Sequence, residues 1–113
     1  MYKYYITVTR VIDGDSIVAD IDLGFNLKLN RHIRLMGIDA PEIRTKDLEE
    51  KAKGARCKAR LVELLDFVDN KAELISHGLD KYGRVLGVVR VKSHRDSLND
   101  LLVLEGVAKT YVP

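Results

Sequence analysis

The residues best suited to chemistry lie in one short stretch that runs from Arg34 to Glu42. Within nine residues it holds one guanidinium, Arg34, two carboxylates, Asp39 and Glu42, and the turn formers Gly37 and Pro41. A strand that ends in such a turn brings both signs of charge into one small site. This combination suits the hydrolysis of a phosphodiester, in which a cation and a guanidinium share the developing negative charge while a carboxylate handles a water.

The length and composition are typical of one globular domain that spans residues 1–113. With 46% hydrophobic and 32% charged residues, the chain is long enough for a core and too short for two domains. It contains no run of about 18 apolar residues, so we expect no association with a membrane. The N-terminus lacks the apolar core and small-residue cleavage site of a signal peptide, which favours a cytoplasmic location.

The cysteine and histidine residues do not form a metal or disulfide pattern. A single cysteine, Cys57, excludes an internal disulfide and a CxxC motif, and it lies among helix-forming residues. We therefore expect a buried structural thiol. The histidines, His32, His77 and His94, lie in different segments without ligand spacing, and we assign them no role.

Positive charge is concentrated directly after the Arg34–Glu42 stretch. The net charge of the chain is only +2, but residues 43–60 carry 7 basic and 3 acidic residues, a net charge of +4. These cations can attract a polyanion toward the neighbouring carboxylates. A solvated helix face accounts equally well for any one of them.

Hydrophobic periodicity predicts an antiparallel meander of three strands in the first third of the chain. Apolar and polar residues alternate along residues 3–9, 17–23 and 27–35, and the residue types favour strands. Turn residues separate the three runs at 13–15 and at 24–26.

The remainder of the chain is predicted to contain a helix, two strands and a second helix. From about Asp47 to Val68, apolar residues recur at three- and four-residue steps. Its expected buried face consists of Ala52, Ala55, Ala59, Val62 and Leu65 or Phe67. Apolar runs at 72–76 and 85–91 predict the strands, and the spacing of Ser97 and Asp100 resembles a capping box that begins the second helix. This order predicts a mainly β fold, a five-stranded Greek-key barrel of the OB type with two helices, in which the first helix closes one end.

Four blocks of the sequence resemble the signature blocks of the thermonuclease, or staphylococcal-nuclease-like, family. In chain order they are residues 11–16 (VIDGDS), 33–42 (IRLMGIDAPE), 80–87 (DKYGRVLG) and 97–108 (SLNDLLVLEGVA). The blocks occur in the family's order and cover nearly the whole chain. The resemblance implies an OB-fold enzyme that uses calcium to hydrolyse phosphodiester bonds of DNA and RNA.

The resemblance also implies a role for six residues. Asp15 and Asp39 fall on the family's metal-binding aspartates, and Ala40 falls on a position that ligates through its backbone carbonyl, where the family often has Thr. Glu42 falls on the carboxylate usually assigned as the general base or water-positioning group. The two arginines that grip the scissile phosphate correspond to Arg34 and Arg84.

The chemistry of these residue types agrees with those roles. Ca²⁺ takes six to eight oxygen ligands, which two aspartates, a main-chain carbonyl, waters and a substrate phosphate can supply. A set without His or Cys argues against zinc. An arginine offers a planar fork of donors to phosphate oxygens, which a lysine does not.

The expected partner is DNA or RNA, with single strands preferred and little sequence specificity, because the recognisable groups address phosphate and not base edges. Lys81 and Tyr82 resemble family residues that contact a terminal phosphate. Tyr111 is a candidate for stacking on a base, and a packing role is equally plausible. Many family members continue with a further helix, so we also expect the surface left bare at the end of this chain to favour self-association.

Each motif also has a purely structural interpretation, and the whole has an alternative function. Asp13-Gly14-Asp15 is an ordinary turn signal, and the loop before Arg84 could be a plain hairpin connection. The alternative function is a nuclease-like barrel without activity that binds nucleic acid or protein. The complete charged set favours the enzyme, because a binding module is free to lose any of its members.

Overall fold

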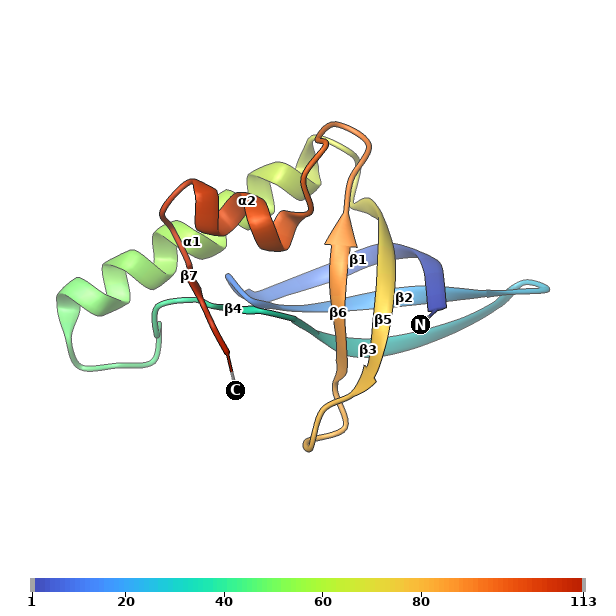
Figure 1. The fold of residues 1–113 in the computed structure, drawn as a ribbon, viewed down its shortest axis with the longest axis horizontal. Coiled ribbons are helices and arrows are strands. Elements are labelled where there is room, and N and C mark those ends of the chain that lie inside the picture. The colour runs from blue at the N-terminus through green and yellow to red at the C-terminus, as the bar shows by residue number, and fades with distance from the viewer. Residues whose placement is uncertain (1, 113) are drawn as a thin grey trace.

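The computed structural model describes residues 2–112, and its main feature is a closed barrel of five strands (Figure 1). The barrel strands are β1 (Tyr2–Asp13), β2 (Ser16–Gly24), β3 (Leu27–Leu35), β5 (Lys71–Leu79) and β6 (Val85–Arg90). They follow the spatial order β1-β2-β3-β6-β5. With two helices beside it, this mixed barrel is consistent with an OB-type fold and confirms the predicted fold class.

The first three strands form the predicted meander. β1 pairs antiparallel with β2, and β2 pairs antiparallel with β3, with Ile17 opposite Ile33. β1 is longer than the alternation predicts, because it continues through register shifts between Val8 and Arg10 and between Val11 and Asp13. Such irregularities break the two-residue pattern without ending the strand.

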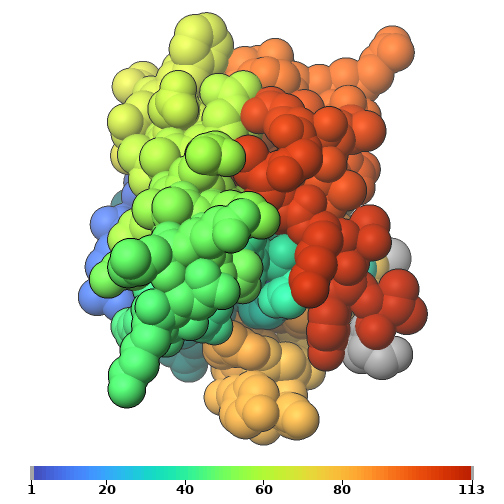
Figure 2. All heavy atoms as spheres, turned by 90° about the vertical axis from the view of Figure 1, so that its left-hand side faces the viewer, coloured from blue at the N-terminus to red at the C-terminus, as the bar shows by residue number. Residues whose placement is uncertain are grey.

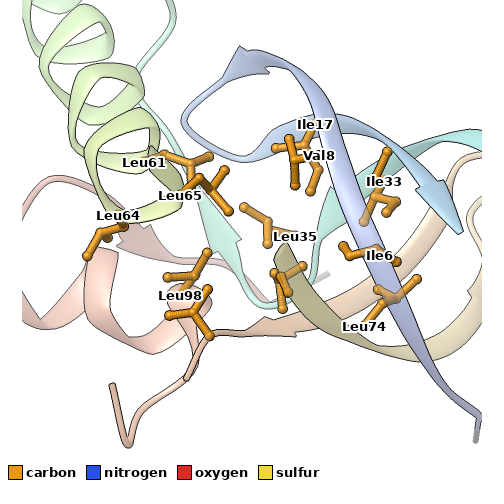
Figure 3. Packing of buried hydrophobic residues seen from close by; sticks show 14 of the residues in the cluster. Ile6, Val8, Ile17, Ile33, Leu35, Leu61, Leu64, Leu65, Leu74 and Leu98 are labelled. Carbon is orange, nitrogen blue, oxygen red and sulfur yellow. The ribbon is translucent and has the colours of Figure 1, made fainter. Parts of the chain in front are cut away.

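The barrel closes where β3 and β6 run parallel over three residue pairs, from Ile33 opposite Val85 to Leu35 opposite Gly87. This pairing brings the end of β3, which carries Arg34, next to the beginning of β6, which follows Arg84. The inward side chains fill the interior, and Figure 3 shows Ile17, Ile33 and Leu35 packed among them.

Helix α1 (Leu48–Asp66) covers one end of the barrel, but its buried face is not the predicted one. Its N-cap is Asp47, whose side chain accepts hydrogen bonds from the backbone amides of Glu49 and Glu50. The buried residues are Gly54, Cys57, Leu61, Leu64 and Leu65, whereas Ala52, Ala55 and Ala59 are exposed. Leu61 and Leu65 point toward the barrel core (Figure 3), and Leu64 is buried as well, so the larger side chains decide the orientation.

Two glycines let α1 and its surroundings approach closely. A Cβ on Gly54 would lie 2.6 Å from the carbonyl oxygen of Pro41 and 2.8 Å from Cγ1 of Ile43. A Cβ on Gly14 would overlap Sγ of Cys57. α1 therefore contacts both the turn before Asp15 and the segment that follows β4.

The chain ends with α2 (Leu98–Leu104) and a small sheet that the sequence patterns do not predict. Ser97 caps α2 as expected, since its hydroxyl accepts from the amide of Asp100. In the small sheet, β4 (Ile38–Asp39) pairs antiparallel with β7 (Lys109–Thr110). This pairing holds the last described residues beside the turn that follows β3. Among residues 2–112, no helix has both the length and the apolar character needed to cross a membrane.

Candidate functional site

Three segments that are distant in sequence meet at one groove of about 450 Å³. The end of β3, its turn and β4 form one continuous stretch, and the others are the loop between β5 and β6 with the start of β6, and the segment after β7. The lining includes Arg34, Asp39, Lys81, Tyr82, Arg84 and Tyr111, six of the nine predicted site residues. Figure 2 shows the region of β4 (teal) between α1 (green) and the C-terminal segment (red), above the β5–β6 loop (light orange).

Arg34 is held at the groove by the backbone around it. Nη1 donates to the carbonyl of Leu35 at 2.7 Å, and Nη2 donates to the carbonyl of Ile38 at 2.8 Å. The side chain is 14% exposed. These bonds fix the guanidinium between the end of β3 and β4, so its position depends on the turn that joins them.

Two carboxylates flank Arg34. Nη1 lies 3.6 Å from Oδ2 of Asp15, and Nη2 lies 3.6 Å from Oδ1 of Asp39. Asp15 is nearly buried, and its oxygens also accept from the hydroxyl of Ser16 at 3.1 Å and from the backbone amide of Ala40 at 2.9 Å. Asp39 is much more exposed and lines the groove. The structure thus brings Asp15, Asp39 and Ala40 together around Arg34.

Arg84 is held by its own loop, through a carboxylate that the sequence interpretation did not include. Nε of Arg84 donates to Oδ2 of Asp80 at 2.7 Å, and the backbone amides of Arg84 and Tyr82 donate to Oδ1 of Asp80, both at 2.9 Å. Desolvation raises the pKa of Asp80, but the hydrogen bonds from Arg84 and Tyr82 outweigh it, so the pKa lies below its ordinary value of 3.8. Asp80 is therefore ionised at neutral pH and orients Arg84.

Tyr82 joins this cluster through its ring. The guanidinium carbon of Arg84 lies 5.4 Å from the ring centroid, and Nζ of Lys81 lies 5.2 Å from it. Tyr82 is 72% exposed. The loop therefore presents two cations and one aromatic ring to the groove, on a frame made by Asp80.

Tyr111 is placed by the small sheet. Its backbone amide donates to the carbonyl of Gly37 at 2.9 Å, directly after the pairing of β7 with β4. The residue is 48% exposed and lines the groove. A tyrosine that is half exposed beside a groove has a ring face available for contact with a ligand.

Glu42 lies outside the set of groove-lining residues. It is exposed, its backbone amide donates to Oε2 of Glu50 at 3.1 Å, and its Oε1 accepts from the backbone amide of Arg44 at 3.4 Å. It follows β4 by three residues and packs beside α1 through Pro41. Its carboxylate belongs to the loop between β4 and α1.

One histidine lies near the arginine loop. Burial lowers the pKa of His32 below its ordinary value of 6.5, and the positive charge of Arg84 lowers it further. Within residues 2–112, its Nε2 is the one buried side-chain polar atom without a hydrogen-bond partner. No motif in the sequence marks His32, which lies in β3 two residues before Arg34.

The side chains around Arg34 offer oxygen atoms, the donor type that a hard divalent cation takes. In the described part of the chain, no group of three or more His, Cys, Asp or Glu side chains is arranged to hold a metal ion. The pair formed by Asp15 and Asp39 supplies oxygen only, and each carboxylate oxygen keeps a second lone pair beyond the bonds given above. Oxygen is the donor type that calcium takes and that distinguishes such a pair from the Cys- and His-rich sites of structural zinc.

A comparison with protein-family models matches residues 32–113 to the model described as staphylococcal nuclease homologue. A search of curated proteins gave no match. The matched segment contains the end of β3, β4, the β5–β6 loop and the C-terminal strand, while Asp15 precedes it. Since the match covers well over half of the chain, this protein belongs to the staphylococcal nuclease homologue family.

Proposed function

We propose that this protein is a calcium-dependent nuclease that hydrolyses phosphodiester bonds of DNA or RNA with low sequence specificity. One observation carries the proposal: Arg34 and Arg84, which lie 50 residues apart in the sequence, line the same groove together with Asp39. Two guanidiniums and a carboxylate in one groove form a site for a phosphate diester and not for a neutral ligand.

The two arginines bind and stabilise the phosphate. Both lie partly buried, which strengthens their interaction with an anion. Arg84 is oriented in advance by Asp80, and Arg34 by the backbone carbonyls of Leu35 and Ile38. Donors that are already in place need no reorganisation when charge develops on the phosphate oxygens.

The carboxylates of Asp15 and Asp39 are the proposed calcium ligands, together with the backbone carbonyl of Ala40. When bound, calcium would neutralise a phosphate oxygen and lower the pKa of a nearby water. Both carboxylates lie near Arg34, at 3.6 Å from Nη1 for Asp15 and at 3.6 Å from Nη2 for Asp39.

Glu42 is the proposed base that orients or deprotonates the attacking water. It follows Asp39 by three residues on an exposed loop, and its Oε1 accepts only a long 3.4 Å bond from the amide of Arg44. A weakly held carboxylate can turn toward bound substrate at little cost.

The substrate is a polynucleotide, with single strands preferred. Tyr82 and Tyr111 border the groove with exposed rings, which can stack on unpaired bases of any sequence. Lys81 adds a positive charge beside Tyr82 for a neighbouring phosphate. None of these groups distinguishes one base from another by its hydrogen-bonding edge.

The test is cleavage of an end-labelled single-stranded DNA by the purified protein in calcium, in magnesium and in excess chelator. We expect cleavage in calcium and none in chelator. We also expect Glu42→Gln to lower the rate at least about tenfold without changing the unfolding midpoint, while the exposed control Glu49→Gln keeps the wild-type rate. Cleavage that persists in chelator, or a Glu42→Gln variant as active as the wild type, contradicts the mechanism. Binding of DNA without cleavage would instead identify a nuclease-like binding module.

A further inference from the structure

A second groove of about 360 Å³ lies on the outer surface of β1, β5 and β6, away from the proposed phosphodiester site. Its lining includes Tyr5, Lys71, Glu73, Arg90 and Lys92. The strand registers explain this arrangement. Tyr5 pairs opposite Glu73 and Glu73 opposite Arg90, so these three side chains form one row across the sheet.

The charges of this groove favour an anion. Three cations line it, Lys71, Arg90 and Lys92, against the two carboxylates of Asp69 and Glu73. Glu73 is already neutralised by Lys3, whose Nζ lies 2.6 Å from Oε2. Lys71, Arg90 and Lys92 therefore face an incoming ligand with Asp69 as the one lining carboxylate that Lys3 does not neutralise.

An exposed aromatic ring lies among these cations. Tyr5 is 70% exposed on an outward position of β1, and Lys71 lies one row away, opposite Thr7. A tyrosine that belongs to a core has a covered ring, whereas the ring of Tyr5 faces solvent beside the basic side chains. Aromatic rings interleaved with basic side chains are the usual elements of a surface that binds single-stranded nucleic acid.

The two grooves lie on the same face of β6. Along this strand the buried residues Val85, Gly87 and Val89 alternate with outward ones, and the outward Leu86 lines the first groove while the outward Arg90 lines the second. Four residues of strand place these two side chains about 13 Å apart. Figure 1 shows β6 beside β5, running from the β5–β6 loop at the bottom toward the turn after α1 at the top. A chain bound at the first groove can therefore continue along the strand to the second without crossing the barrel.

We infer that the second groove binds the part of a single-stranded polynucleotide that extends beyond the scissile phosphate. The inference rests on the proposed function, because it assigns the continuation of that substrate. Lys71, Arg90 and Lys92 contact successive phosphates, and Tyr5 stacks on a base. The groove thus makes the affinity depend on substrate length, and it makes a long strand a better substrate than a dinucleotide.

The experiment compares two lengths of single-stranded DNA, three and twelve nucleotides, both with phosphorothioate linkages so that they are not cut. Binding is followed by fluorescence anisotropy at several salt concentrations. We expect Lys71→Ala/Lys92→Ala to weaken binding of the 12-mer about tenfold and to reduce its salt slope by about 1.4, since each lost phosphate contact on a single strand removes about 0.7. We expect Tyr5→Ala to weaken the 12-mer by roughly tenfold through lost stacking. Binding of the 3-mer stays unchanged in both variants.

The matched control is Lys28→Ala/Arg31→Ala, which removes two exposed cations from the β2–β3 hairpin and should leave both affinities unchanged. Equal losses in the control and in the groove variant overturn the inference, because they indicate a general effect of net charge. Equal wild-type affinity for the two lengths overturns it as well. Failure of the proposed function is distinguishable, since it is detected as absence of cleavage of unmodified DNA in calcium, whereas failure of the inference is detected in the binding of the uncut 12-mer.

Discussion

Arg84 reaches the groove as part of a hydrogen-bonded loop and not as an isolated side chain. Asp80 accepts from Nε of Arg84 and from two backbone amides of the same loop, so one carboxylate fixes both the loop and the guanidinium. The motif that contains Arg84 was recognisable in the sequence, but the role of Asp80 was not. Its spacing of four residues is equally typical of a hairpin loop, and only the loop's conformation shows that the two side chains meet.

A double-mutant cycle tests whether Asp80 acts through Arg84. We expect Asp80→Ala to lower the rate of DNA hydrolysis about tenfold, because the guanidinium is no longer held in the orientation that phosphate requires. In an Arg84→Ala background the same change should cost less than about twofold. Rates that fall by the same factor in both backgrounds would show that Asp80 acts independently of Arg84. Circular dichroism on all four proteins controls for unfolding.

At the scale of elements, α1 and the small β4–β7 sheet position the site. α1 packs against the backbone of Pro41 at Gly54 and against Gly14 at Cys57, so it holds the segments on both sides of Arg34. Asn99 connects α2 to the turn after β3 and to β6. Its Nδ2 donates to the carbonyls of Met36 and Gly87, and its Oδ1 accepts from the amide of Val89. Each of these backbone groups would cost about 1–3 kcal/mol if left buried and unpaired.

Gly54→Ala tests the contact between α1 and the segment that carries Glu42. In an open helix the change would stabilise by up to about 1 kcal/mol. Here the added Cβ meets the carbonyl of Pro41 at 2.6 Å, so we expect a loss of about 1–3 kcal/mol in the free energy of unfolding measured with urea. Ala55→Gly, at the exposed neighbouring position, measures helix propensity alone and should cost about 1 kcal/mol. A stabilised Gly54→Ala protein would refute the close packing.

The elements themselves were largely predictable, whereas their contacts were not. Alternation predicted β1, β2 and β3, and apolar runs predicted β5 and β6. Asp47 and Ser97 are caps whose side chains accept hydrogen bonds from the first turn of each helix. The predicted buried face of α1 was largely wrong, because alanines at three- and four-residue steps satisfied the pattern. The residues that are buried are Gly54, Cys57, Leu61, Leu64 and Leu65, of which the prediction included Leu65. Strands of two residues, such as β4 and β7, are too short to produce any period.

At the scale of the whole molecule, one buried core joins the barrel to both helices. It includes side chains from β1, β2, β3, β5, β6, α1 and α2. Cys57 is fully buried within it, as the sequence predicted. Burial, assisted by the negative charge of Asp15, raises the pKa of the Cys57 thiol to about 11 from its ordinary value of 9.0. The neutral thiol therefore contributes stability that is complete below pH 9 and is lost as the pH rises toward 11.

Cys57 can therefore report the opening of the core. At pH 8 we expect a thiol reagent such as DTNB to modify the native protein at least about 10³ times more slowly than the urea-unfolded protein, because reaction requires both exposure and ionisation. The labelled fraction should rise with urea at the same midpoint as the far-ultraviolet circular dichroism. Rapid modification in the absence of urea would show that α1 separates from the barrel without global unfolding.

The account depends most directly on Arg34 and Arg84 acting on one phosphate in one groove. The measurement that tests this is the rate of single-stranded DNA hydrolysis in calcium by Arg84→Ala, compared with the exposed control Arg31→Ala at equal stability. We predict a loss of about 10² to 10³ for Arg84→Ala, the usual effect of removing one such donor, and no loss for Arg31→Ala. A rate for Arg84→Ala equal to that of the control would contradict the claim that this groove is where the phosphodiester is hydrolysed.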